Sequence, residues 1–381
     1  MQEMRLTCRA RKSMIKTDME QSFDLKNYLA SGVEHVLRDI LKATAKNPKE
    51  SAFMAKFALR AKASSSVRAD QSFLPPFLIA SVTSLCNMHC KGCYVRGIGS
   101  CHDAAGAPAG EMLTADEWRS VFSQARDAGI CFIIIVGGEP LLRPDVLEAA
   151  AEFPEILFPV FTNGTLMNDH YLALFDKHRN LVPILSLEGD QQATDERRGS
   201  GIYETLLDCM TQMSDLSLLF GASITVTTEN IRNVTDTRFI DEMQKHGCRA
   251  VFFVDYVSTS DADWALEPAD EQREYMKEKM ADFRRDYPEM IFISFPGDEK
   301  ASGGCLAAGR GFFHINAYGG AEPCPFSPYS DRNVRETPLT EIMESILFRT
   351  LHESGMLLED HPGGCVLASR DAEVRALAEA E

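Results

Sequence analysis

Short apolar runs alternate with helical stripes along most of the chain. Strands are predicted at 77–83, 130–136, 156–162, 181–188, 222–227 and 250–257, with a short one at 291–294. Helical spacing of apolar residues predicts helices at 114–128, 144–153, 168–178, 202–216, 235–246 and 269–286. Strands that are apolar on both faces are typical of a parallel sheet. About 220 residues for six such units fit an α/β fold with a partial six-stranded (β/α)6 barrel better than a closed eightfold one.

Both flanks depart from this alternation. Residues 1–22 carry no strong pattern, helices are predicted at 23–46 and 49–63, and 64–72 is predicted to be a linker. The C-terminal part is rich in Gly, Pro and Cys, with a predicted hairpin turned at Gly319-Gly320 and a helix near 338–352. We therefore expect three parts. They are an N-terminal helical extension over 1–72, the partial barrel over 73–298, and a small Cys-containing α+β extension over 299–381.

Composition and charge narrow the class of protein. The chain is 45% hydrophobic and 25% charged, which is ordinary for a globular protein and excludes disorder of the whole. Its net charge of −17 disfavours nucleic-acid binding. Residues 1–70 nevertheless hold 14 basic and 8 acidic side chains. The basic helices of residues 23–63 are therefore expected to dock on the acidic body, the alternatives being a partner or a peripheral membrane contact.

Cysteine usage points to metal chemistry. The chain has 11 cysteines, an odd number, and carries no apolar export signal or apolar run long enough to span a membrane. We therefore expect a cytoplasmic protein without a disulfide framework. Cys131, Cys209 and Cys248 lie in apolar or helical contexts and are interpreted as buried small hydrophobic residues.

Three cysteines directly follow the first predicted strand, at the end where parallel barrels place their chemistry. Cys86, Cys90 and Cys93 have the spacing C-x3-C-x2-C. Three thiolates can hold three irons of a [4Fe–4S] cluster and leave the fourth iron open to a ligand. A zinc knuckle, or cysteines without a ligand role, is the alternative. Cys101 and His102 follow in a Gly-rich loop and are interpreted as incidental, an extra ligand or reactive thiol being the alternative.

This triplet resembles that of the radical S-adenosylmethionine (SAM) superfamily. That family carries CxxxCxΦC after its first barrel strand, where Φ is usually aromatic. Here the Φ position is Gly92, and the aromatic residue Tyr94 follows the third cysteine. Tyr94 is therefore included among the candidate cofactor-binding residues.

Polar motifs at the ends of the following strands extend the resemblance. Gly-Gly-Glu-Pro follows the second strand and matches the family's GGEP motif, which contacts the methionyl amino group of S-adenosylmethionine (AdoMet). Arg198 is preferred to Arg197 as the residue that pairs with the AdoMet carboxylate. The candidate AdoMet-binding residues, with Tyr94, are Gly137, Gly138, Glu139, Thr162, Asn163, Ser186 and Arg198.

The C-terminal cysteines resemble those of SPASM and twitch extensions, which carry auxiliary iron–sulfur clusters. Cys305, Cys324 and Cys365 all lie among Gly or Pro residues. The resemblance implies one auxiliary [4Fe–4S] cluster. Its fourth iron would be open, or held by substrate or by a non-cysteine ligand such as His361.

The resemblance implies an oxidoreductase or maturase. In that family a reduced cluster cleaves AdoMet to a 5′-deoxyadenosyl radical, which abstracts hydrogen from a substrate. We expect an unidentified peptide, tetrapyrrole or other cofactor, or lipid-like substrate, and a reductant such as flavodoxin or ferredoxin. Asp255, Tyr256 and Tyr318 are further candidates for substrate contact, although a structural role is favoured for them. The alternatives are a non-catalytic iron–sulfur electron carrier and a zinc-stabilised binding module.

Overall fold

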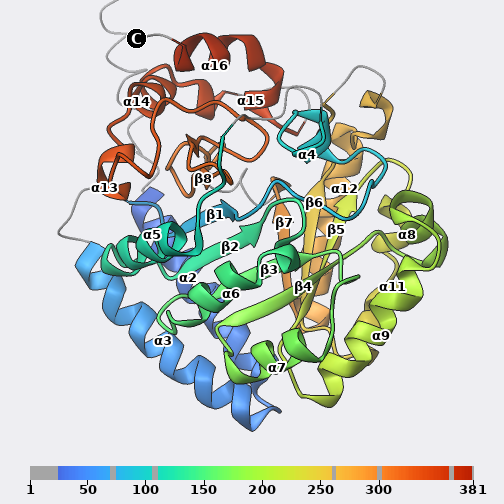
Figure 1. Cartoon of the computed structure of the whole chain (residues 1–381). Helices are drawn as coiled ribbons and strands as arrows, with labels where there is room; N and C mark the ends of the chain where they lie inside the picture. Colours follow the sequence, from blue (N-terminus) through green and yellow to red (C-terminus); the bar gives the residue numbers. More distant parts are fainter. Residues whose placement is uncertain are drawn as a thin grey trace, which may run out of the picture.

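One curled, open half-barrel sheet dominates the computed structural model, which describes residues 25–68, 74–104, 110–259, 263–297, 303–359 and 364–379 (Figure 1). The strand order is β7-β6-β5-β4-β3-β2-β1-β8-β9. The barrel strands are β1 (Phe77–Ser81), β2 (Phe132–Val136), β3 (Phe158–Thr162), β4 (Leu181–Leu187), β5 (Gly221–Val226), β6 (Ala250–Asp255) and β7 (Ile291–Phe295). They pair in parallel, which confirms the predicted partial barrel.

Helices that follow the strands cover one face of the sheet. They are α5 (Ala115–Asp127), α6 (Pro144–Ala151), α7 (Asp169–Lys177), α9 (Ile202–Asp215), α11 (Thr237–Lys245) and α12 (Asp270–Asp286). Each helix buries the apolar stripe read from the sequence. In α5, for example, Trp118 and Phe122 are fully buried. That helix starts at a capping box between Thr114 and Glu117.

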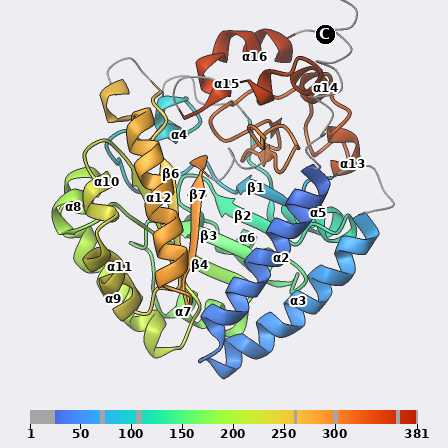
Figure 2. The ribbon, with the colours of Figure 1, turned by 180° about the vertical axis from the view of Figure 1, so that it is seen from behind.

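The N-terminal helices lie across the other face of the sheet. Figures 1 and 2 place α2 (Leu25–Thr44) and α3 (Pro48–Arg68) on the side of β2–β4 away from α6 and α7. Met54 and Phe57 of α3 share an apolar cluster with Val182 and Ile184 of β4. The helices therefore cover the inner face of the sheet near the N-terminal ends of its strands, and their apolar side is buried there.

Ion pairs also hold the N-terminal helices against the barrel. Arg179, in the turn before β4, forms a buried ion pair with Glu50 of α3 at 2.5 Å. Lys46 also pairs with Glu289 at 2.7 Å. The expected docking of these helices on the body is confirmed, but the buried ion pair has the opposite polarity, with its acid on α3 and its base on the body. The predicted linker is partly wrong, since α3 continues through residues 64–68, while 69–72 lie outside the described residues.

The C-terminal extension adds two strands to the barrel sheet. β8 (His314–Ile315) pairs in parallel with β1, and β9 (Ala321–Glu322) pairs antiparallel with β8. This confirms the predicted hairpin. The predicted helix near 338–352 is instead two helices, α13 (Leu339–Ile342) and α14 (Ile346–Glu353), because Ser345 caps a new N-terminus by accepting from the Phe348 amide. α15 (Val366–Ser369) and α16 (Asp371–Ala378) follow.

No helix in the described ranges is both long enough and apolar enough to cross a membrane.

Candidate active site

The cysteine loop leaves the C-terminal end of β1 and runs into α4 (Tyr94–Gly97). Cys86, Cys90 and Cys93 are each partly exposed along it. Burial raises the pKa of Cys86 to about 11, and the neighbouring charges of Glu139, Cys90 and Cys93 add to that rise. The three thiols are thus close enough to interact electrostatically, at the barrel end where a parallel sheet places its chemistry.

Two glycines after β2 hold this loop by close backbone contact. The Gly138 amide donates to the Thr83 carbonyl at 2.8 Å, and the Glu139 amide donates to the Leu85 carbonyl at 2.8 Å. A Cβ on Gly138 would stand 2.0 Å from the Leu85 carbonyl oxygen, and one on Gly137 would stand 2.5 Å from that of Thr83. Only glycine at these two positions allows the backbone after β2 to approach the cysteine loop so closely.

The Glu139 carboxylate joins the ends of β2 and β3. It is 1% exposed and accepts from Thr162 Oγ1 at 2.7 Å, the Asn163 amide at 2.8 Å and the Leu141 amide at 3.0 Å. Burial raises the pKa of Glu139, and these hydrogen bonds oppose the rise. Asn163 Nδ2 in turn donates to Asn87 Oδ1 at 2.9 Å, which adds a further link to the cysteine loop.

Both arginines of the candidate pair contact one buried carboxylate. Arg197 and Arg198 end helix α8 (Gln191–Arg198). Arg198 Nε donates to Glu188 Oε1 at 2.8 Å, and Arg197 also pairs with Glu188. Glu188 was not among the candidate residues, although it directly follows the apolar run of β4. It is the residue that sequence reasoning missed at this corner of the site.

The two arginines differ in what else they contact. Arg197 Nε donates to the Lys91 carbonyl at 3.1 Å, and the Lys91 amide donates back to the Arg197 carbonyl at 2.9 Å. Arg198 is the more buried of the two. Burial raises the pKa of Cys90, and the positive charge of Arg198 is the main effect opposing that rise. Arg197 therefore holds the cysteine loop, while Arg198 places its charge beside Cys90.

Ser186 lies on the inner face of β4. It follows Val182 and Ile184 at two-residue spacing, and those residues pack against the N-terminal helices. Ser186 is partly exposed and lies opposite Ser223 of β5. The inner face thus changes from apolar to polar towards the end of the strand that leads to Glu188.

Two tyrosines flank the cysteine loop in different ways. Tyr256, just after β6, lies against Gly92, where a Cβ would meet Tyr256 Oη at 2.8 Å. Tyr94 packs its ring on Phe326 with centroids 4.8 Å apart. Burial raises the pKa of Tyr94, and the charges of Cys93 and Cys324 raise it further. Tyr94 therefore lies between the cysteine loop and the C-terminal extension.

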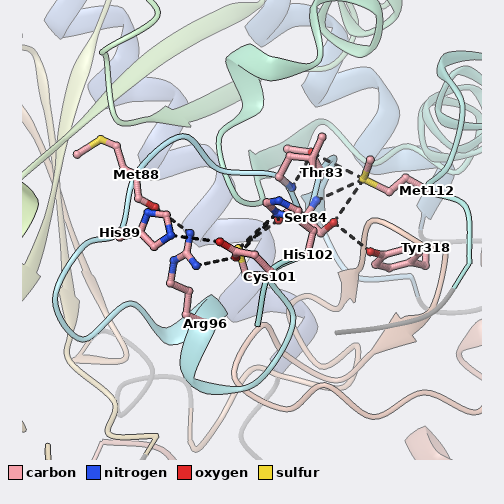
Figure 3. Close-up of polar contacts among 11 residues, drawn as sticks. Thr83, Ser84, Met88, His89, Arg96, Cys101, His102, Met112 and Tyr318 are labelled. Carbon is pink, nitrogen blue, oxygen red and sulfur yellow. Dashed lines mark hydrogen bonds and ion pairs between the residues drawn. The ribbon is translucent and has the colours of Figure 1, made fainter. Parts of the chain in front are cut away.

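A polar cluster around Ser84 anchors the base of the loop (Figure 3). Ser84 Oγ lies 3.0 Å from Tyr318 Oη and 3.5 Å from Met112 Sδ. The Cys101 thiol donates to the Ser84 carbonyl at 3.3 Å. These contacts bring the cysteine loop, the following Gly-rich loop and the C-terminal hairpin together.

Cys101, His102 and Asp103 bring their potential ligand atoms within 4.8 Å of one another. Arg96, however, donates to Asp103 Oδ1 at 2.6 Å, and the Cys101 thiol donates to the Ser84 carbonyl. This arrangement favours a loop-anchoring role for Cys101. Cys131, Cys209 and Cys248 are buried, as predicted.

The auxiliary cysteines all lie in the C-terminal extension. Cys324 is 3% exposed just after β9, and Cys365 caps the N-terminus of α15, where its Sγ accepts from the Ala368 amide at 3.4 Å. The Cys305 amide donates to the Leu357 carbonyl at 2.8 Å. His361 lies outside the described residues.

A buried arginine ties the Cys365 segment to the barrel. Glu267 accepts from the Gly364 amide at 2.8 Å and from Arg273 at 3.0 Å. Arg273 also pairs with Asp255 at 3.4 Å. Asp255, a candidate substrate contact, is thus occupied in positioning this segment.

Residues 80–241 match the Radical SAM superfamily. The chain is 28% identical over 305 residues to the AdoMet-dependent heme synthase of Methanosarcina barkeri (strain Fusaro / DSM 804), covering 73% of this chain and 85% of that protein. It is 27% identical to the PqqA peptide cyclase of Rhizobium meliloti (strain 1021), covering 71% and 74%.

Solved structures share the fold. Streptococcus suis SuiB matches with a TM-score of 0.60 at 17% identity, over 80% of this chain and 73% of that one. Native anSMEcpe with bound AdoMet and Cp18Cys peptide matches with a TM-score of 0.58 at 16% identity, over 75% of this chain and 84% of that one.

Proposed function

This chain belongs to the radical SAM superfamily of enzymes, and on that premise we propose that Cys86, Cys90 and Cys93 hold a [4Fe–4S] cluster that works with AdoMet to remove hydrogen from a substrate. The observation that carries the proposal is the position of the three cysteines. They lie on one loop at the C-terminal end of β1, and β2, β3 and α8 all hold that loop in place.

The residues present fit these groups. Three partly exposed cysteines supply the soft sulfur ligands that iron–sulfur clusters require. Glu188 Oε2 and Tyr256 Oη are buried beside the loop and have no hydrogen-bond partner among the described residues. Buried polar atoms of this kind are normally satisfied, so they favour a polar ligand at this position. When bound, the cluster and AdoMet supply the one-electron chemistry, which belongs to the cofactors.

The chain positions and shields those groups. Gly137, Gly138 and Glu139 fix the cysteine loop, and Thr162 and Asn163 fix Glu139. Arg198 and Ser186 supply a cation and a hydroxyl for the polar groups of AdoMet. The N-terminal helices bury the inner face of the sheet near the N-terminal ends of its strands.

Tyr256 supplies the aromatic ring that the motif lacks. Gly92 stands where the family carries an aromatic residue, and Tyr256 fills the space beside it. Tyr94 already packs against Phe326. We therefore place Tyr256, ahead of Tyr94, against the adenine of AdoMet.

The substrate is a peptide or a tetrapyrrole. A heme synthase and a peptide cyclase each match more than 70% of this chain, so both substrate classes are compatible with this architecture. A small iron–sulfur or flavin protein, such as ferredoxin or flavodoxin, supplies the electron.

An auxiliary [4Fe–4S] cluster is held by Cys305, Cys324 and Cys365. The ring of Tyr94, directly after Cys93, packs on Phe326, two residues after Cys324, so the cysteine loop lies next to the C-terminal extension. Anaerobic reconstitution should give about eight irons per chain, and the variant with all three cysteines changed to Ala should give about four, because each cluster holds four irons. Eight irons in that variant would exclude the auxiliary cluster.

The central test is 5′-deoxyadenosine formation by the reconstituted chain under strong reductant. The native chain should form it, and Cys90→Ala should not, while circular dichroism shows that the variant is folded. If the reconstituted chain bound iron but did not cleave AdoMet, the result would favour a non-catalytic iron–sulfur electron carrier. A colourless protein containing zinc would favour a binding module.

A further inference from the structure

A chain of hydrogen bonds links three side chains of β1, β8 and β9. Ser81 Oγ lies 2.7 Å from His314 Nε2, and His314 Nδ1 lies 2.7 Å from Glu322 Oε2. His314 and Glu322 are 5% and 3% exposed, respectively. None of these residues was singled out by the sequence, and neither the cysteine loop contacts nor the proposed AdoMet site uses them.

Strand register fixes this geometry. His314 and Glu322 are directly opposite each other in the β8–β9 hairpin, and His314 pairs in register with Ile79 of β1. Ser81 follows Ile79 by two residues, so both side chains lie on the same face of β1. The three groups are therefore held by the sheet itself rather than by flexible loops.

A second set of hydrogen bonds orients the carboxylate. Asn316 Nδ2 donates to Glu322 Oε1, which leaves Oε2 for His314. Asn316 Oδ1 accepts from the amides of Tyr318 and Gly320, each at 2.9 Å. The hairpin turn thus holds Asn316, and Asn316 holds Glu322.

A proton relay through these groups uses one imidazole tautomer. With the hydrogen on His314 Nδ1, that nitrogen donates to Glu322 Oε2. The Nε2 lone pair is then free to accept the hydroxyl hydrogen of Ser81. A hydroxyl, an imidazole and a carboxylate joined in this order form an arrangement suited to proton transfer. The imidazole acts as the base that removes the hydroxyl proton, and the carboxylate orients the imidazole.

Ser81 and His314 both line a pocket between the cysteine loop and the C-terminal hairpin. Thr83, Gly137 and Tyr94 line the same pocket. Ser81 precedes Cys86 by five residues, and Glu322 precedes Cys324 by two. The polar chain therefore reaches a pocket that lies next to the proposed radical chemistry.

We propose that Ser81, His314 and Glu322 form a proton relay that accepts a proton from an O–H or N–H group of the substrate in this pocket. The relay rests on the proposed function, because loss of a hydrogen atom from a carbon makes a neighbouring O–H or N–H group more acidic. The substrate O–H or N–H bond breaks, and its proton passes to Ser81 Oγ. The hydroxyl proton of Ser81 passes to His314 Nε2, and Glu322 stabilises the imidazolium. Two protons shift by one position each, so the net transfer is one proton from the substrate to His314, and no electron moves.

The tautomer of His314 tests the relay in the full chain without added cofactor. Selective ¹⁵N labelling of histidine, with His314→Gln to assign the signal, should show hydrogen on Nδ1 and none on Nε2. In Glu322→Gln, Asn316 still donates to the side-chain oxygen, so the amide NH₂ faces Nδ1 and the hydrogen should move to Nε2. Ser100→Ala, which alters another residue of the same pocket, should leave the tautomer unchanged. A hydrogen on Nε2 in the native chain would overturn the relay.

Access from the pocket separates a relay from a buried structural histidine. Diethyl pyrocarbonate acylates unprotonated imidazole nitrogens, and Ser81→Ala uncovers Nε2. His314 should be acylated in Ser81→Ala, with the exposed His170 as the internal standard. Failure to modify His314 while His170 reacts would assign His314 to the core and overturn the relay.

AdoMet cleavage distinguishes failure of the relay from failure of the proposed function. Without substrate, the reconstituted native chain should form 5′-deoxyadenosine whether or not the relay exists, because the relay acts on the substrate alone. Its absence would overturn the proposed function, and with it the relay's role, whatever the tautomer. Its formation together with a hydrogen on Nε2 of His314 would overturn the relay alone.

Discussion

Gly138 lies so close to Leu85 that a single added methyl group would stand 2.0 Å from the Leu85 carbonyl oxygen. The contact is between two backbones, so no side-chain rotation can relieve it. Gly138→Ala should therefore displace the cysteine loop, and it should lower the iron bound after reconstitution by more than half. The strain should cost about 1–3 kcal/mol of stability, as over-packing does elsewhere.

Gly32→Ala is the matched control, because a Cβ at Gly32 meets nothing within 4 Å. Iron determination and far-UV circular dichroism should show a folded Gly138→Ala chain with little iron and a Gly32→Ala chain with native iron. Equal iron in the two variants would refute the clamping role of Gly138.

Removing one cysteine of the triplet should abolish its cluster. Cys90→Ala should lower bound iron by about four per chain, because a [4Fe–4S] cluster is not retained on two protein ligands at this site. Cys101→Ala should keep all of its iron, since the Cys101 thiol donates to the Ser84 carbonyl. Iron and sulfide analysis after anaerobic reconstitution measures both, and loss of iron in Cys101→Ala would make that residue a ligand.

Arg197 and Arg198, which both pair with Glu188, should have different roles. Arg198→Ala should weaken AdoMet binding about tenfold, which is about 1.4 kcal/mol, and should leave the iron content unchanged. Arg197→Ala should instead lower the iron content, because it removes the hydrogen bond to the Lys91 carbonyl. Calorimetric titration with AdoMet and iron analysis measure the two effects, and the reverse outcome would exchange the assignments.

An ion pair between α5 and the C-terminal extension should make stability depend on pH. Hydrogen bonds from the Arg335 guanidinium and the Thr114 amide lower the pKa of Glu117 from 4.5 to about 2. Because the pKa is lower in the folded chain, the stabilisation is present above pH 4.5 and is lost as the pH falls towards 2. The pair is partly exposed, so Arg335→Ala should cost only about 0.5–1 kcal/mol at pH 7.

Thermal unfolding at pH 7 and pH 3 measures this contribution. The difference in melting temperature between native chain and Arg335→Ala should shrink at the lower pH. Arg332→Ala removes a neighbouring exposed arginine that donates to the Asp331 carbonyl, and it should follow the native chain at both values. A constant difference for Arg335→Ala would argue against the pair.

The packing of α3 inside the half-barrel should carry much of the stability. Phe57 is 1% exposed and meets Phe132 of β2 edge-on, with centroids 5.7 Å apart. Phe57→Ala should cost about 3–5 kcal/mol, as truncation of a buried aromatic residue does. Leu59→Ala, at a residue that is 72% exposed, should cost little. Guanidinium unfolding compares them, and equal midpoints would mean that α3 does not pack there in solution.

Local periodicity predicted the barrel because it reports which faces of an element are buried. The run at 156–162 became β3 (Phe158–Thr162), and the stripe at 202–216 became α9 (Ile202–Asp215). The spacing of Cys86, Cys90 and Cys93 was equally local, since all three lie on one loop. Local patterns therefore sufficed to predict the fold class and the position of the cysteine loop, and the motifs sufficed for the resemblance to the radical SAM superfamily.

Contacts between distant segments were decided by the tertiary structure alone. Nothing near Gly138 in the sequence indicates that its partner is Leu85, and nothing near Arg198 indicates Glu188 as its counter-ion. His314 meets Ser81 only because β8 adds to the edge of β1 in one particular register. The physical reason is that the local pattern of apolar residues in a segment encodes which of its faces is buried. Which residue lies against that face depends on the order of the strands, their register and the way the helices pack across them.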